Sequence, residues 1–347
     1  MRVRIELITL APLGGSFTSG HKDGSQPLQE TGTQLRCALL VGLMVAYTQW
    51  LYCRNDWRSI VRKFSWMLMV LLVLVGCSEE ITAVVEAVVE TEPSPPDKIT
   101  WGKDGKEMAL IPAGAFEMGD SKKEPDGLME NAWPVHAVEL DAFYMDTTEV
   151  TVGQFRQFLA ESGYEYDENW NHVARYSHSD EYPMVYVSWK DAIAYAEWVG
   201  KRLPTEAEWE KAARSKLKGQ RYVWGDDLKL ANHHANFNGK QGKDKWDQTT
   251  APVGSLFVNG YGLYDMVGNV GEWCADLYKK DYYLDSPYKN PKGPDSSVKG
   301  VRVLRGGSWL NCAYYLRVAY RSFNFPLMRN SYYGFRCVAD VKQSSLN

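Results

Sequence analysis

The sequence predicts an irregular α+β fold with low regular secondary structure, in which a few helices and short strands are joined by long loops. Three segments combine a helix-capping pattern with helical spacing of apolar residues, and several short segments alternate as strands do. Aromatic residues make up 13% of the chain. Because Trp and Tyr join a large apolar body to a polar tip, they can hold long loops together where regular elements are few.

Each predicted helix begins after a Ser or Thr whose third following residue can reach back to the backbone. These pairs are Thr151 with Gln154, Ser188 with Asp191, and Thr205 with Glu208. Gly200 is a suitable C-cap for the second helix. The apolar spacing predicts a buried face on the first and third helices, made of Val152, Phe155, Phe158, Leu159, Trp209, Ala212 and Ala213.

Extended segments lie on both sides of these helices. Residues 108–120 alternate around Pro112-Ala113-Gly114, and we interpret them as a hairpin. Residues 138–151 supply another extended stretch, and shorter strands are expected at 301–305 and 333–341. The folded domain is expected to span residues 106–342, with a short tail at 343–347.

The residues before this domain resemble an export signal and a tether. A basic region from Arg58 precedes a nine-residue apolar run, Met67 to Val75, and the sequence Leu-Val-Gly-Cys ends at Cys77. The run is shorter than the roughly 20 residues of a membrane span and is typical of a secretory signal. Because the ending resembles the bacterial lipobox, we expect acylation of Cys77; a buried core segment is the alternative.

A lipidated Cys77 would place the protein in the cell envelope, anchored on the periplasmic or surface face of a membrane. Residues 1–76 would then be a leader, with the signal peptide at about 61–76. Signals normally lie at the start of a chain, so we hypothesise that Val61 is the true initiator. Residues 77–105, acidic and then Pro-rich, are interpreted as a tether.

Net charge and cysteine content limit which classes of function this protein can have. The net charge of −4 provides no basic footprint for nucleic acid. Cys37 and Cys53 precede the expected cleavage point, which leaves three thiols in an oxidising compartment: Cys274, Cys312 and Cys337. Three cysteines permit one disulfide and one free thiol, and the sequence leaves open which thiol is free.

Four long segments, in order, resemble the formylglycine-generating enzyme (sulfatase-modifying factor) family. They are residues 183–214, 250–278, 304–309 and 333–340, and the similarity extends over about 106–342. The resemblance implies a single-domain fold related to C-type lectins, with bound calcium. It also implies a protein or peptide partner, because the family's best-known activity is oxygen-dependent oxidation of a sulfatase cysteine, within C-x-P-x-R, to formylglycine.

The resemblance places two calcium sites on this chain. The first has the side chains of Asp265 and Glu272 and the carbonyls of Gly268 and Val270. The second has the side chains of Asn236 and Asp244 and the carbonyls of Phe237 and Trp246; one extra residue before Thr250 lets Asp247 compete with Asp244. Ca²⁺ takes about six to eight oxygen ligands, with carboxylates and backbone carbonyls mixed, and these groups are of that kind. The alternative is an acidic turn capped by its own backbone.

The catalytic part of the resemblance fails after Gly306-Gly307-Ser308. Oxygen-using members have two cysteines there, five residues apart, that bind Cu(I) and the substrate thiol, and soft thiolates select Cu(I). The matching positions in this chain are Asn311 and Leu316, so copper is not expected. Gly271 also replaces the family's usual tryptophan, which predicts more space near the groove and altered substrate handling.

Cys312 and Ser308 remain the candidate catalytic residues. A reactive thiolate needs nearby cations or a helix N-terminus, and Arg305 and Arg317 are the nearest cations in sequence. The alternative for Cys312 is a partly buried thiol, or half of a disulfide with Cys274 or Cys337.

Three functions stay open. One is a calcium-stabilised binding module that holds a peptide or glycan near Gly271, Ser308 and Trp309. Another is a family enzyme with different chemistry, which uses another metal or a partner protein. The third is the formylglycine-generating oxidase, with a sulfatase as partner. The missing cysteine pair favours the first two.

Overall fold

The computed structural model describes residues 95–122, 127, 129–239, 246, 248–297 and 299–341. The chain divides into two compact units, and all of these residues belong to the second, which begins at Pro93. Val61, Cys77, Asp244 and Asp247 lie outside the described residues, as do the leader and most of the expected tether. Within the described ranges, no helix is long and apolar enough to cross a membrane.

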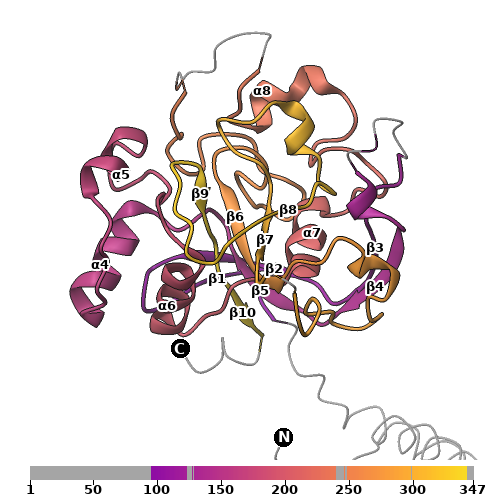
Figure 1. Cartoon of the computed structure of the whole chain (residues 1–347), viewed down its shortest axis with the longest axis horizontal. Helices are drawn as coiled ribbons and strands as arrows, with labels where there is room; N and C mark the ends of the chain where they lie inside the picture. Colours follow the sequence, from indigo (N-terminus) through magenta and orange to yellow (C-terminus); the bar gives the residue numbers. More distant parts are fainter. Residues whose placement is uncertain are drawn as a thin grey trace, which may run out of the picture. The chain divides into compact units, whose positions relative to one another are not determined.

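Three small sheets form the frame of the domain (Figure 1). The first is antiparallel, in the order β1 (Lys98–Thr100), β2 (Glu107–Ile111), β5 (Phe143–Asp146) and β10 (Val338–Asp340). The second pairs β3 (Gly114–Met118) with β4 (His136–Leu140). The third has the order β8 (Ser322–Asn324), β7 (Arg302–Arg305), β6 (Gly271–Leu277) and β9 (Tyr333–Gly334), with β9 parallel to β6. Because β1 pairs with β2, the folded part includes residues ahead of the expected start at Lys106.

The expected hairpin at residues 108–120 is wrong. Strand β2 pairs with β1 and β5, whereas β3 pairs with β4, so the two halves of the segment belong to different sheets. Pro112 has no N–H to donate to a ladder. Gly114 has a φ of +132°, which redirects the chain from one sheet to the other.

The three predicted helices are confirmed. They are α4 (Val152–Ser162), α6 (Trp189–Val199) and α7 (Glu206–Arg214), and each begins with both hydrogen bonds of its capping box. Helices α4 and α6 end at Gly163 and Gly200, both left-handed. Figure 1 shows α4, α5 and α6 on one side of the domain and α7 beside the sheets.

The remaining helical segments are short. Helix α5 (Trp170–Tyr176) begins after Asn169, and α8 (Ala231–His234) is a single turn. Four 3₁₀ turns complete the list among the described residues: η1 (Glu130–Ala132), η2 (Leu228–Leu230), η3 (Tyr282–Leu284) and η4 (Ala313–Leu316). These turns and the small sheets confirm the α+β class with low regular content.

Two hydrophobic clusters make up the core. One contains Phe155, Phe158, Tyr195, Trp273 and Phe335 beside α4 and α6. The other surrounds α7 and contains Trp209, Ala212, Ala213, Met145 and Met266. The predicted faces are therefore buried, although Leu159 is only partly so.

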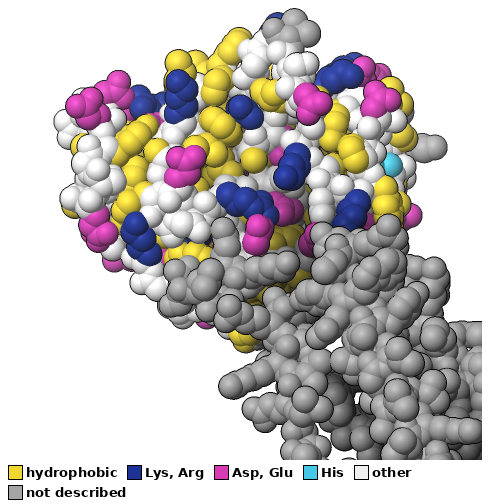
Figure 2. Space-filling model, turned by 90° about the horizontal axis from the view of Figure 1, so that it is seen from below, with side chains coloured by type: hydrophobic (Ala, Val, Ile, Leu, Met, Phe, Trp, Pro, Cys, Tyr) yellow, Lys and Arg dark blue, Asp and Glu magenta, His cyan; other side chains and the backbone are white. Residues whose placement is uncertain are grey.

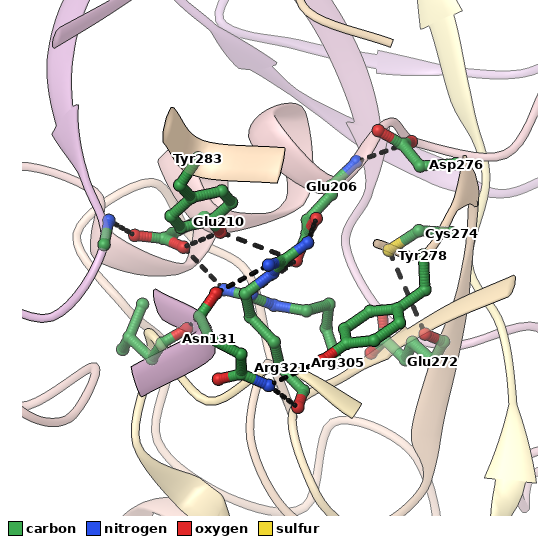
Figure 3. A network of polar contacts seen from close by, with 12 residues as sticks. Asn131, Glu206, Glu210, Glu272, Cys274, Asp276, Tyr278, Tyr283, Arg305 and Arg321 are labelled. Carbon is green, nitrogen blue, oxygen red and sulfur yellow. Dashed lines mark hydrogen bonds and ion pairs between the residues drawn. The ribbon is translucent and has the colours of Figure 1, made fainter. Parts of the chain in front are cut away.

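Helix α7 also carries a buried ion network (Figure 3). Arg305 donates to Glu206 at 2.8 Å and to Glu210 at 2.6 Å, and Arg321 donates to Glu206 at 2.7 Å. Arg214 closes the network through Glu210 at 2.9 Å. Each charge is paired, as a buried ion requires, so the network fixes α7 against β7 and the segment after it.

Candidate functional site

The loop before β6 folds tightly against residues 235–237. Asp265, Gly268 and Asn269 all have positive φ values. A Cβ on Gly268 would lie 2.4 Å from the backbone oxygen of Asn236, so only glycine fits this close approach. Asn269 N donates to Asn236 O at 2.8 Å, and the Asn236 amide Nδ2 donates to Asn269 Oδ1 at 3.3 Å. The fold thus brings Asn236, predicted for the second calcium site, beside the loop predicted for the first.

A carboxylate that the sequence analysis did not select lies in the same place. Glu149, which follows β5, is fully buried, and its Oε1 accepts from Asn269 Nδ2 at 3.1 Å. Asp265 is also buried, and its Oδ2 accepts from Gly254 N at 2.7 Å. In the sequence, Glu149 is recognisable only as one residue of the extended stretch at 138–151. Its burial against a loop about 120 residues further along the chain has no signal in local sequence.

Three buried oxygens in this cluster accept no hydrogen bond in the described part of the chain while both carboxyl groups are ionised, and a proton on either carboxyl group joins Glu149 to Asp265 by a side-chain hydrogen bond. The three oxygens are Glu149 Oε2, Asp265 Oδ1 and Asn236 Oδ1. Buried polar atoms are normally satisfied, so three together require an explanation. A hard cation is the kind of group that oxygens without donors accept.

Burial and mutual repulsion shift the acidity of the two carboxyl groups. Burial raises the pKa of Glu149 well above its usual range, Asp265 raises it further, and Arg336 opposes the shift. Burial likewise raises the pKa of Asp265 to about 6, against the hydrogen bond from Gly254 and the charge of Arg336. Both shifts mean that the folded protein disfavours two uncompensated negative charges at this position.

Glu272, the other carboxylate predicted for the first site, is held by Arg336. Arg336 Nε lies 2.9 Å from Glu272 Oε1 and 2.8 Å from Oε2, and its Nη2 donates to Oε1 at 2.7 Å. Trp209 Nε1 donates to Oε2 at 2.8 Å. Both oxygens of Glu272 therefore already have donors.

The predicted second site is described only in part. Asn236 and Phe237 are buried, and the Phe237 carbonyl accepts from Gly239 N at 3.0 Å. The Trp246 carbonyl accepts from the Thr249 hydroxyl at 2.7 Å. Within the described ranges, no three His, Cys, Asp or Glu side chains are grouped as metal ligands, so an ion here would also need neutral oxygens.

The Gly-Gly-Ser segment lies directly against the loop. Gly268 N donates to Gly306 O, and Trp309 N donates to Asn269 O, both at 2.9 Å. Ser308 is 1% exposed, and its hydroxyl donates to Asn311 Oδ1 at 2.8 Å. This hydroxyl is committed to holding the turn.

The two positions that carry thiols in oxygen-using relatives hold no copper ligand in this chain. Asn311 is the amide that accepts from Ser308, and Leu316 is fully buried in the core around α7. The residues present therefore do not fit a cuprous ion, which selects soft sulfur ligands.

The disulfide that three cysteines permit does not form among the three thiols of the described domain. Cys274, Cys312 and Cys337 are all free. Cys274 and Cys337 are fully buried in different hydrophobic clusters and are core residues, whereas Cys312 is exposed. Burial raises the pKa of both core thiols well above the usual range, so they stay protonated.

Of the two cations nearest to Cys312 in sequence, one is committed to other partners. Arg305 is fully buried and paired with Glu206 and Glu210. Arg317 stacks its guanidinium on the Tyr314 ring at 4.1 Å. The thiol lines a cavity of about 330 Å³ together with Lys229, Phe237 and Tyr314.

The stretch after Ser308 presents many apolar side chains to solvent. Six large ones, each more than a third exposed, lie within residues 310–328: Leu310, Tyr315, Phe323, Phe325, Leu327 and Met328. These six residues follow one another along the chain, and we call them the apolar face. Next to it, Trp309 stacks on Tyr176 with ring centres 5.5 Å apart.

The space around Gly271 and the distribution of surface charge complete the description of the site. A Cβ on Gly271 would meet Tyr332 O at 3.5 Å and the Tyr333 ring at 3.7 Å, so the position tolerates a small side chain. Figure 2 shows basic and acidic side chains interspersed over the face it presents, with neither sign forming a continuous patch there.

The fold agrees with what comparison with known proteins shows. The model for sulfatase-modifying factor enzyme 1-like domains matches residues 97–341, and the chain belongs to this family. The formylglycine-generating enzyme of Streptomyces coelicolor is 38% identical over 288 residues, which cover 68% of this chain and 90% of the relative.

Other relatives differ in what their names state. The inactive C-alpha-formylglycine-generating enzyme 2 of Bos taurus is 34% identical, over 67% of this chain and 87% of its own length. The serine/threonine-protein kinase pkn1 of Chlamydia pneumoniae is 40% identical, but the match spans only 40% of that protein. Among solved structures, PvdO from Pseudomonas aeruginosa has a TM-score of 0.63 and 29% identity, over 72% of this chain and all of PvdO.

Proposed function

We propose that this protein is a family member without the copper-dependent oxidase chemistry, which acts as a calcium-stabilised binding module for a protein or peptide at the cell envelope. One observation carries the proposal: an engaged amide, Asn311, and a core leucine, Leu316, occupy the two thiol positions. A family oxidase needs two sulfur ligands there, and neither residue supplies one.

The buried cluster fits calcium in its chemistry. The buried side chains of Glu149, Asp265 and Asn236 offer carboxylate and amide oxygens, which Ca²⁺ binds together with carbonyl oxygens. A bound ion would supply the positive charge that the cluster lacks. It would also tighten the loop at 265–272, to which residues 306–309 are hydrogen-bonded.

The apolar face is the proposed place of peptide contact. Surfaces rich in large exposed apolar side chains often mark sites of protein or peptide contact. This group follows Ser308 and Trp309 in the chain, and the loop that would hold calcium supports the start of the segment. A protein or peptide ligand with apolar side chains fits this surface better than a glycan, because sugars require more polar contacts than it offers.

The envelope location rests on the sequence of the leader. A lipid on Cys77 and the 77–105 tether would present the domain to partners outside the cell membrane. Mass spectrometry of the native N-terminus tests this: a diacylglyceryl-modified Cys77 supports it, and a peptide from residues 1–60 in the mature protein contradicts it.

The main experiment separates binding from oxidation. The copper-loaded protein is mixed with oxygen and a C-x-P-x-R peptide, and the peptide is followed by mass spectrometry and by fluorescence anisotropy. The Streptomyces coelicolor relative serves as positive control. We expect no aldehyde from this chain; robust conversion of the peptide thiol would reinstate the oxidase.

A second candidate is catalysis through Cys312 by other chemistry. The exposed thiol lines the cavity beside Lys229, which favours this reading over a purely structural cysteine. Selective alkylation of native protein, compared with Cys312→Ser, tests whether the thiol is accessible and reactive.

A further inference from the structure

We propose that a cavity beside η1 and η3 binds a small organic amine. Asp120 is the contact of its ammonium group, and Trp133 donates a hydrogen bond to a carbonyl oxygen next to that group. The cavity shares no residue with the 265–272 loop or with the apolar face, so the inference goes beyond the proposed function. Calcium and peptide binding would stand or fall on other residues.

The cavity is formed where two stretches of chain pack closely. It has a volume of about 840 Å³, which is in the range of small-molecule sites. Asp120 N donates to Ala132 O at 3.0 Å, and a Cβ on Gly119 would lie 2.7 Å from the same oxygen. The backbone at 119–120 therefore lies directly against the segment 132–135, which supplies part of the cavity wall.

The segment around η3 supplies another part of the wall and is fixed to η1. Arg321 Nη1 donates to Asn131 O at 2.6 Å, and Asn131 Nδ2 donates to Tyr278 Oη at 3.0 Å (Figure 3). Lys280 pairs with Glu130 at 3.1 Å, where both side chains are more than half exposed. These contacts hold the cavity in shape by themselves, so a ligand would enter a site that is already formed.

Two polar groups of the wall are buried without a partner among the described residues. Asp120 is 7% exposed, and its Oδ1 accepts from Lys122 N at 3.2 Å, whereas its Oδ2 accepts from no group. Trp133 Nε1 is buried as well and has no acceptor. Buried polar atoms normally have partners, so an acceptor and a donor that lack them on adjoining stretches indicate a ligand with complementary groups.

The charges and donor types of the wall select an organic cation. Glu130 and Asp281, the other acidic residues of the wall, are exposed, and each pairs with a lysine. A metal ion would need several oxygen ligands, and the Trp133 N–H only donates, so it cannot coordinate one. An ammonium group satisfies Asp120 through a charge-assisted hydrogen bond, and an acceptor on the same ligand satisfies Trp133.

The rest of the wall favours an apolar body on that ligand. Pro134, Val135 and Leu284 line the cavity together with the Trp133 side chain. Small-molecule sites commonly combine such an apolar lining with a few placed polar groups. The class that fits is an aliphatic amine with a carbonyl oxygen beside the amine, and the amide of an apolar amino acid is its simplest example.

The test titrates the full chain with L-leucinamide at about pH 6, where the amine is protonated. Two analogues each lack one group: 4-methylpentanamide has no ammonium, and isopentylamine has no carbonyl. Calorimetry measures affinity, and NMR follows the indole N–H signal of Trp133. We expect saturable millimolar binding of leucinamide and binding of 4-methylpentanamide that is weaker by about tenfold or more. Leucinamide should shift the Trp133 signal, and isopentylamine should leave it in place.

Three variants assign the contacts. Asp120→Asn keeps the oxygen that accepts from Lys122 N and removes the charge, so it should weaken leucinamide binding by about tenfold or more. The control, Asp180→Asn, changes an exposed carboxylate outside the cavity wall and should bind as wild type. Trp133→Phe identifies the indole signal and should weaken binding of leucinamide while leaving that of isopentylamine unchanged. Melting curves of all three variants show whether each is folded.

The outcomes separate the site from its assigned contacts. Absence of saturable leucinamide binding to wild type would overturn the site. Equal affinity for leucinamide and 4-methylpentanamide, or unchanged binding by folded Asp120→Asn, would overturn the ammonium contact. Equal weakening by Asp120→Asn and Asp180→Asn would also overturn it, because the effect would then be one of overall charge. None of these results depends on whether the protein binds calcium.

Discussion

Replacing Gly268 with alanine should destabilise the domain through the contact between the 265–272 loop and Asn236. The residue has φ +80°, and its new Cβ would lie 2.4 Å from Asn236 O and 3.0 Å from Asn236 N. The left-handed backbone costs about 1 kcal/mol for a residue with a side chain. Overpacking against backbone, which cannot rotate away, adds about 3 kcal/mol.

The total of about 4 kcal/mol should lower the melting temperature by about 8–16 °C in a domain of this size. Gly163→Ala provides the matched control, because Gly163 has φ +69° and nothing within 4 Å of its Cβ position. It should cost only the backbone term, or about 2–4 °C. Differential scanning calorimetry in EDTA measures both variants without the contribution of an ion. Equal losses for the two glycines would refute the claim that close approach to Asn236 fixes this loop.

Three other predictions address the buried charges and the thiols. Arg336→Gln leaves Glu272 buried without its cation and should lower the free energy of unfolding in urea by about 3–5 kcal/mol. The control, Arg156→Gln at the exposed pair with Asp180, should lower it by under about 1 kcal/mol. Similar losses for the two variants would show that burial does not set the strength of the pair. Burial raises the pKa of Asp276 well above its usual range, so its contribution to stability is present at low pH and is lost as pH rises through the folded-state pKa. Asp276→Asn should therefore flatten that part of the pH-stability curve and stabilise the domain at pH 7, and an unchanged curve would contradict the assignment. Peptide mapping after brief iodoacetamide treatment should find Cys312 alkylated and Cys274 and Cys337 protected until urea is added, while labelling of either core thiol in native protein would contradict their burial.

The helices could be predicted because their signals are local. Thr151, Ser188 and Thr205 each act on a residue three positions away, and the apolar spacing reports the buried face directly. The family resemblance likewise follows from contiguous segments. The missed helix α5 is only seven residues long, too short for a clear period.

The partners of the strands could not be predicted from such local signals. Residues 108–120 alternate correctly for two strands, but alternation does not name the neighbouring strand, and β2 and β3 joined different sheets. The pairing and burial of the cysteines also depend on contacts between distant parts of the chain. Spacing allows a disulfide among three thiols, whereas the fold separates Cys274 and Cys337 into two clusters and leaves Cys312 at the surface.

The sequence by itself determined the family, the α+β class, the capped helices and the absence of a thiol pair after Ser308, since each depends on residue identity or short-range order. Only the tertiary structure decided which carboxylates are paired. It joined Glu272 to Arg336, buried Glu149 beside Asp265, and placed Asn236 against Asn269. The physical reason is that desolvation and charge balance depend on groups brought together from distant parts of the chain, and no local pattern encodes their sum.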